Sequence, residues 1–117
     1  SGSDGDIVNA AAQAIGIGPV VGVRTWGGVV GIDGRFDLVD GTSVTQPRYA
    51  TWMAGKDWGL ENHGVDPDIE VQHTPADYFS ADDPQLDRAM ARALELLEEH
   101  GSQQPPALPD PRVRPRT

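Results

Sequence analysis

The sequence contains no cysteine, and its only lysine is Lys56. Without thiols, the 117 residues can form neither disulfides nor cysteine–zinc sites, and no thiol can act as a nucleophile. Long apolar runs are missing as well, because none approaches the roughly 20 residues that a membrane-spanning helix needs. The sequence therefore predicts neither thiol chemistry nor a membrane-spanning segment.

Positive charge is scarce, with 9 Lys and Arg against 18 Asp and Glu and a formal net charge of −9. Nucleic acids and anionic membrane surfaces attract basic proteins, so we expect neither to be a partner. An acidic surface is compatible with cationic peptide substrates. It is also an ordinary way for a protein to remain soluble, and this simpler reading is favoured.

Composition divides the chain into two parts. A length of 117 residues suits one small domain with a modest core, and 38% of the residues are hydrophobic. Residues 101–117 contain five prolines, several arginines and almost nothing that could pack. We therefore expect a domain over residues 1–100, followed by a disordered Pro/Arg-rich tail over residues 101–117.

The first predicted element is a helix over residues 6–15, where apolar side chains recur at helical spacing. Ser3, Asp4 and Asp6 can supply capping oxygens at its start. The β-branched residues at 19–23 then predict a buried strand. A helix followed directly by a buried strand is typical of a layered α/β domain.

The middle of the chain predicts a meander of short strands. Asp33-Gly34, between apolar residues, is a strong hairpin-turn signal, and Asp40-Gly41 indicates a second turn. We expect further short strands at residues 58–61 and 69–71.

The last predicted element is a helix that begins near Asp83, which can cap it, and Pro84, which fits the first helical position. Gly101 follows its final turn. One face carries apolar side chains: Leu86, Met90, Ala93, Leu94 and Leu97. The whole pattern predicts a small layered α/β domain with two main helices and a mostly short-stranded sheet.

Ser3 lies just before the first predicted helix, beside backbone amides that have no helical partner. Those amides and the helix dipole can stabilise a developing oxyanion, and Gly5 leaves room for a substrate backbone. The same Ser-Asp-Gly-Asp sequence is also an ordinary helix cap or part of a linker. Residue types alone leave these interpretations open.

Glu61 is a second candidate for a functional side chain. Its neighbours Trp58 and Leu60 are apolar, and an unpaired carboxylate among them would be costly. A site serine or histidine would supply hydrogen-bond donors, although a surface glutamate at a strand end fits equally well. His63, directly before Gly64, is interpreted as a turn residue and not as a base.

Metal ligands are not expected. The histidines lack metal-ligand spacing, and the cluster of Asp66, Asp68 and Glu70 lacks the glycine and the spacing of a calcium loop.

Four stretches of the chain carry a resemblance to a known family. They are Ser3-Asp4-Gly5-Asp6-Ile7, then the run from Gly22 to Ile32, then the run from Glu61 to Val71, and finally Asp83-Pro84-Gln85-Leu86. In this order they resemble the C-terminal catalytic segment of the tricorn proteases and, more broadly, the tail-specific or C-terminal processing peptidases. The resemblance extends from Ser3 to about Glu99.

This resemblance implies a serine peptidase with a Ser-His-Ser-Glu tetrad, no cofactor, and a fold related to the crotonases and the Clp protease. Ser3 matches the nucleophile, the backbone amide of Asp4 matches one oxyanion donor, and Glu61 matches the acid that fixes the second serine. The family's histidine, second serine and other oxyanion donor lie upstream of the matched segment. We therefore expect the remainder of a peptidase chain to complete the site, and the 117 residues alone to be inactive.

Relatives with a Ser-Lys dyad provide a contrast. Their lysine lies in a stretch that matches Thr25-Trp26-Gly27-Gly28, and Gly28 stands at the lysine position here. The tetrad is therefore favoured over the dyad.

The resemblance also implies short peptides as substrates, a cytoplasmic location and assembly as a homo-oligomer. The alternative is a non-catalytic module of the same descent, which binds peptides or supports assembly through an inert site.

Overall fold

The computed structural model describes residues 1–80, 82–102 and 104–108. Helix α1 (Asp4–Ile15) starts two residues before the predicted helix and ends where predicted. Gly16 has φ 66°, and the amides of Gly16 and Ile17 donate to the carbonyls of Gln13 and Ala12 at 3.2 and 3.1 Å. These bonds satisfy the last helical carbonyls and redirect the chain.

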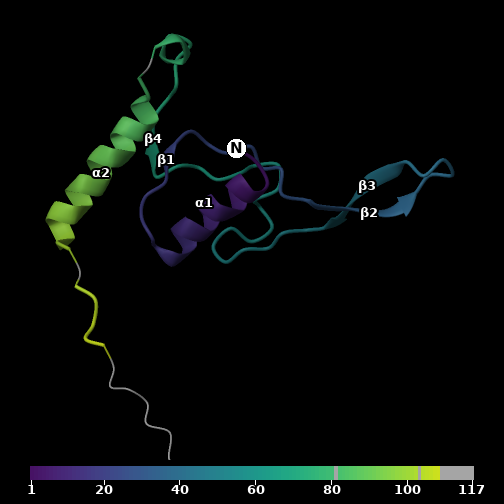
Figure 1. Ribbon diagram of the computed structural model, residues 1–117, viewed down its shortest axis with the longest axis horizontal. Coiled ribbons are helices and arrows are strands. Elements are labelled where there is room, and N and C mark those ends of the chain that lie inside the picture. Colours follow the sequence, from purple (N-terminus) through teal and green to yellow (C-terminus); the bar gives the residue numbers. More distant parts are fainter. Residues whose placement is uncertain (81, 103, 109–117) are drawn as a thin grey trace, which may run out of the picture.

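A short parallel sheet follows α1. Strand β1 (Val21–Gly22) pairs with β4 (Ile69–Glu70), with Val21 opposite Ile69. The expected strand at 19–23 is thus only two residues long, whereas the strand predicted at 69–71 is confirmed at its first two residues. This pairing brings the two halves of the chain together beside α2 (Figure 1).

The second sheet is a hairpin of β2 (Gly31–Asp37) and β3 (Ser43–Tyr49). The turn predicted at Asp33-Gly34 is wrong, because β2 continues through this pair and its register shifts there. The actual turn contains Asp40-Gly41. Asp40 Oδ1 accepts the amide of Thr42 at 3.0 Å, a local bond that favours the turn, while the glycine of the first pair is absorbed in an irregular strand.

The strand predicted at residues 58–61 is also wrong. This stretch forms turns, and the carbonyl of Leu60 accepts the amide of Gly64 at 2.9 Å. Asn62 and Gly64 have φ values of 63° and 83°, which are incompatible with an extended strand.

Helix α2 (Pro84–His100) confirms the last prediction, and a short 3₁₀ helix, η1 (Asp77–Phe79), precedes it. Asp83 Oδ1 accepts the amides of Gln85 and Leu86 at 3.1 and 2.9 Å. The amide of Gly101 closes the other end by donating to the carbonyl of Leu97 at 2.8 Å.

The apolar surface of α2 has two halves, and neither half contains a buried residue. Ala89, Ala93 and Leu96 lie beside residues 17–21, together with which they line a hollow. The other half remains 51–62% exposed and consists of Leu86, Met90, Leu94 and Leu97. The face that the sequence predicted is therefore mostly solvent-exposed.

The core is small. Its buried hydrophobic side chains are Ala10, Val29, Leu60 and Val65, with Ile7 and Met53 packed against them. The radius of gyration is 21.4 Å, whereas a compact domain of this length has about 13 Å. The hairpin projects away from α1 and α2, as Figure 1 shows.

Neither helix of the described residues is long and apolar enough to cross a membrane. The tail predicted over residues 101–117 lies mostly outside the described residues, and the part of it that is described, 101–102 and 104–108, contains no helix or strand.

Candidate functional site

Ser3 lies at the N-terminus of α1 in a conformation that L-residues rarely adopt. Its φ is 54° and its ψ is −110°. A non-glycine residue in this region is strained, and such strain gathers at functional sites, among them the sharp turns that expose the serine nucleophile of other hydrolases. The geometry makes Ser3 a candidate nucleophile.

The first amides of α1 surround this serine. The amide of Gly5 donates to the carbonyl of Gly2 at 3.0 Å, and those of Asp6 and Ile7 donate to the carbonyl of Ser3 at 3.0 Å. No acceptor for the amide of Asp4 is found among the described residues. This amide, at the positive end of the helix dipole, is therefore available to a ligand oxygen.

The predicted capping of α1 by side chains is wrong, because no side chain makes a capping hydrogen bond there. Asp6 is instead fully buried, and its Oδ1 accepts the amide of Gly27 at 2.8 Å. Burial raises the pKa of Asp6, but hydrogen bonds from the Thr25 side chain and the amides of Gly27, Ser3 and Gly28 outweigh it and lower the pKa below 3.8. The buried Asp6 carboxylate thus joins the start of α1 to residues 25–28.

Residues 25–27 are hydrogen-bonded in turn to residues 62–65, which directly follow Glu61. Thr25 and Val65 exchange two hydrogen bonds, from the amide of Thr25 to the carbonyl of Val65 at 3.0 Å and from the amide of Val65 to Thr25 Oγ1 at 2.8 Å. The amide of Asn62 donates to the carbonyl of Gly27 at 2.7 Å. The contact is so close that a Cβ on Gly27 would lie 2.5 Å from the amide nitrogen of Gly64.

Glu61 is half-buried, and its carboxylate is oriented by the backbone. Oε2 accepts the amide of Val29 at 2.7 Å, and the carbonyl of Val29 accepts the Thr51 hydroxyl at 3.0 Å. The donor for the carboxylate is therefore a main-chain amide, which no pattern of side chains could indicate.

One hollow of about 480 Å³ brings the two candidate side chains together. It is lined by Ser3, Trp26, Gly27, Gly28, Val30, Ile32, Glu61 and Asn62. Ser3 lines it from the start of α1, and Glu61 lines it from the turn at residues 58–63. Residues 58 positions apart in the sequence thus face one space.

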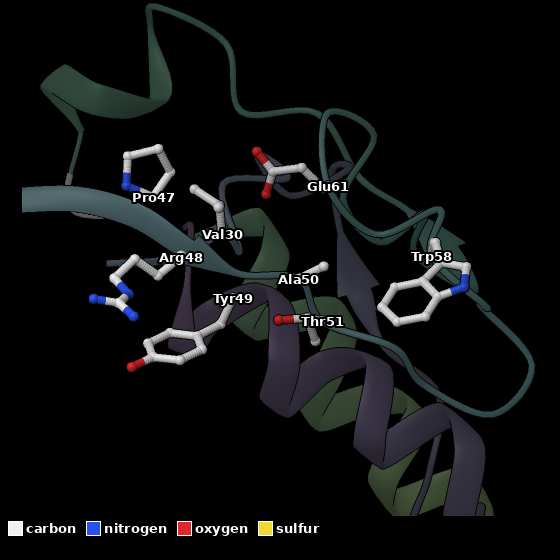
Figure 2. Close-up of a pocket in the computed structure, with 8 residues that line it drawn as sticks. All are labelled: Val30, Pro47, Arg48, Tyr49, Ala50, Thr51, Trp58 and Glu61. Atoms are coloured by element: carbon white, nitrogen blue, oxygen red, sulfur yellow. The ribbon is translucent and has the colours of Figure 1, made fainter. Parts of the chain in front are cut away.

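A second hollow of about 250 Å³ adjoins the first, since Val30 and Glu61 line both. Figure 2 shows the Glu61 carboxylate beside Val30, with the rings of Tyr49 and Trp58 among the other lining groups. The Arg48 guanidinium points away from Glu61 and pairs with Asp33, Nε to Oδ2, at 3.4 Å. Glu61 is therefore accessible from two sides.

His63 lies in a turn, as predicted. Its Nε2 is 2.7 Å from Asp66 Oδ2, and this contact is the main cause of the lowered pKa of Asp66. Neither His63 nor any other histidine or lysine of the described residues lines the hollow with Ser3. A general base for Ser3 is therefore missing from this part of the site.

Among the described residues, no group of three or more His, Cys, Asp or Glu side chains that could hold a metal ion is found. A hydroxyl, a free amide and an oriented carboxylate are groups that acyl transfer can use.

Sequence reasoning missed Asp6, Thr25 and Trp26 as parts of the site. An aspartate in a first helical turn is indistinguishable in sequence from a cap. Thr25 and Trp26 carried a signal only as part of the family motif.

Known proteins share this arrangement of segments. A sequence model of Peptidase family S41 matches residues 1–71. The chain is 66% identical over 109 residues to "Tricorn protease homolog 1" of Streptomyces coelicolor, which covers 93% of this chain and 10% of that protein. It is 46% identical over 105 residues to "Tricorn protease" of Thermoplasma acidophilum, which covers 90% of this chain and 10% of that protein.

A solved structure agrees. "Crystal structure of the tricorn protease" superimposes with a TM-score of 0.77 at 48% identity, over 83% of this chain and 10% of that one. The chain thus spans about a tenth of the length of these relatives. On these matches, the chain belongs to peptidase family S41, as a tricorn-like member.

Proposed function

We propose that these residues form the nucleophile-bearing segment of a serine peptidase that hydrolyses short peptides through a Ser-His-Ser-Glu tetrad. The observation that carries the proposal is the hollow that Ser3 and Glu61 both line. The strained backbone of Ser3 and the free amide of Asp4 support it.

In the proposed reaction, Ser3 Oγ attacks the carbonyl carbon of the scissile peptide bond while a histidine from another segment takes its proton. The amide of Asp4 donates to the resulting oxyanion. The histidine then gives the proton to the leaving amine, and water releases the acyl group from Ser3.

Glu61 is the positioning residue of this proposal. Its Oε2 is held by the amide of Val29, and its carboxylate lines both hollows. A serine from another segment can therefore reach it and orient the histidine. From the same likeness we propose that the peptidase is cytoplasmic. We also propose a homo-oligomeric assembly, which sedimentation of the complete peptidase would test.

Fluorophosphonate labelling of the complete peptidase tests the nucleophile. We expect the label on Ser3, and Ser3→Ala should remove both label and hydrolysis, a loss of about 10³-fold or more. Ser43→Ala is the matched control, because Ser43 lies on the hairpin and bonds to Asp37 at 2.6 Å. A folded wild-type protein with neither label nor hydrolysis would favour the non-catalytic module.

Two further measurements test whether the proposed tetrad is divided between this chain and another segment. The 117-residue chain alone should not cleave peptides, because no histidine or lysine of the described residues lines the hollow with Ser3. Cleavage by this chain that Ser3→Ala abolishes would contradict the division of the tetrad. In the complete peptidase, Glu61→Gln should lower kcat by about a hundredfold or more with little change in KM.

A further inference from the structure

We infer that Trp26 is a fixed aromatic platform that binds a large apolar side chain of the peptide substrate next to the scissile bond. This inference rests on the proposed function and names a substrate preference for the same site.

The Trp26 ring is exposed but not free to move. Although the residue is 77% exposed, a Cβ on Gly2 would lie 2.5 Å from its Cε3, and a Cβ on Gly28 would lie 2.5 Å from its Cζ3. The ring therefore packs against two glycine backbones. The amide of Trp26 donates to the carbonyl of Ser1 at 2.8 Å and fixes the residue further. One side of the ring is thus held by the protein while much of its surface faces solvent.

This platform adjoins the candidate nucleophile. Gly2, against which the ring packs, directly precedes Ser3, and both Trp26 and Ser3 line the 480 Å³ hollow. A peptide whose carbonyl carbon is within reach of Ser3 therefore places a neighbouring side chain over or beside the indole.

The remaining walls suit an apolar side chain. Val30 and Ile32 line the same hollow and are 40% and 60% exposed. Burying them against a ligand removes apolar surface from water. An indole already held in place loses little conformational entropy on binding, and an aromatic ligand adds favourable ring–ring contact.

A basic substrate side chain fits less well. Glu61 is the only charged residue that lines the hollow within the described part of the chain. Its Oε2 is bonded to the amide of Val29, and under the proposed function a serine from another segment binds the same carboxylate. The acidic charge of the whole chain attracts cationic peptides at a distance, but the lining of the hollow favours apolar contact.

The test measures kcat/KM of the complete peptidase on peptides that differ at one residue on either side of the cleaved bond, carrying Phe, Leu, Ala or Arg. Phe and Leu should exceed Ala by about tenfold at one of these positions, the effect of one well-packed apolar contact. Trp26→Ala should remove this preference, so that the kcat/KM values for the Phe, Leu and Ala peptides become similar. Trp52→Ala is the control, because Trp52 is 56% exposed and lines neither hollow.

The rate of fluorophosphonate labelling at Ser3 reports whether each variant keeps an intact site. If Trp26→Ala fails to fold, Trp26→Leu is the deciding variant. It should keep a higher kcat/KM for the Leu peptide than for the Ala peptide, with a smaller advantage for the Phe peptide than in the wild type. A preference of the wild type for Arg, or a preference for Phe that persists in Trp26→Ala, overturns the inference. If Ser3 is still labelled in that case, the proposed peptidase function stands. Absence of labelling at Ser3 overturns both.

Discussion

The part of the molecule formed by α1, residues 25–29 and residues 60–65, here called the body, differs from the β2–β3 hairpin in how it is packed. In the body, backbones approach so closely that side chains are excluded, as at Gly27, and an anion, Asp6, is fully buried. On the hairpin, Phe36 and Val44 remain 60% and 41% exposed, and the two strands contact mainly each other. The geometry of the hollow therefore depends on close contacts between backbone segments. The projecting elements instead carry exposed apolar surfaces of the kind that bind partners.

Helix α2 belongs with the hairpin in this comparison. It is well capped and fully formed, yet much of its apolar face is uncovered. Large exposed apolar patches mark interaction surfaces, and under the proposed function the rest of the peptidase would cover them. Three pairs of substitutions test whether the body and the projecting elements really differ, and a fourth tests the capping of α2.

The largest effect is expected from Gly64→Ala in the body, compared with Gly41→Ala in the hairpin. Both glycines have positive φ, 83° and 81°, but a Cβ on Gly64 would collide with the carbonyl of Thr25, whereas one on Gly41 meets nothing within 4 Å. Gly64→Ala should destabilise the fold by more than about 4 kcal/mol. Gly41→Ala should cost about 1–2 kcal/mol, the strain of left-handed backbone alone. Urea denaturation followed by circular dichroism measures both, and equal losses would contradict the contrast.

Two leucines provide the next comparison. Leu60 is 1% exposed and belongs to the core, while Leu94 on α2 is 62% exposed. Leu60→Ala should lower the free energy of unfolding by about 2–5 kcal/mol. Leu94→Ala should change it by less than about 0.5 kcal/mol in the 117-residue chain, as expected for a surface site. A large loss from Leu94→Ala would show that α2 is covered in solution.

The third pair contrasts a buried and an exposed aspartate. Asp6→Ala leaves the amide of Gly27 without its 2.8 Å partner and should cost about 2 kcal/mol, whereas Asp37→Ala on the hairpin should cost almost nothing. Because the folded-state pKa of Asp6 is lowered from 3.8, its ionised form stabilises the fold above that pH, and this contribution is lost as the pH falls through the lowered pKa. The stability difference between wild type and Asp6→Ala should therefore shrink below pH 3.8, and a constant difference would contradict the role given to the buried anion.

The smallest expected effect concerns the start of α2. Asp83→Ala removes the acceptor for two amides and should destabilise the helix by about 1 kcal/mol. Asp82→Ala should have no measurable effect, because Asp82 lies outside the cap. Helicity and the denaturation midpoint measure both, and an equal effect at the two positions would show that general charge, not capping, stabilises α2.

The two helices could be predicted from the sequence because their periodicity and their end signals agree, as at Asp83 and Gly101. The hairpin was misplaced because two Asp-Gly pairs compete, and the choice between them depends on the bond from Thr42 to Asp40. Residues 58–61 look like a strand, but the positive φ values of Asn62 and Gly64 turn the chain.

The site was partly predictable. Ser3 and Glu61 were candidates from their sequence neighbours, and the family motif assigned roles to them and to the amide of Asp4. The structure places Ser3 and Glu61 on one hollow. Asp6 was misread because burial decides its role. Burial depends on Gly27 and Thr25, which reach Asp6 only after the chain has folded.

The parallel pair β1–β4 has a consequence for how the peptidase is put together. In the described part of the chain these strands pair only with each other, so no further strand lies on the outer edge of either. Such edges accept further strands through main-chain hydrogen bonds with little regard to side chains. A polypeptide that adds a strand to this sheet would be held in a fixed register and direction relative to β1, which leads to Thr25.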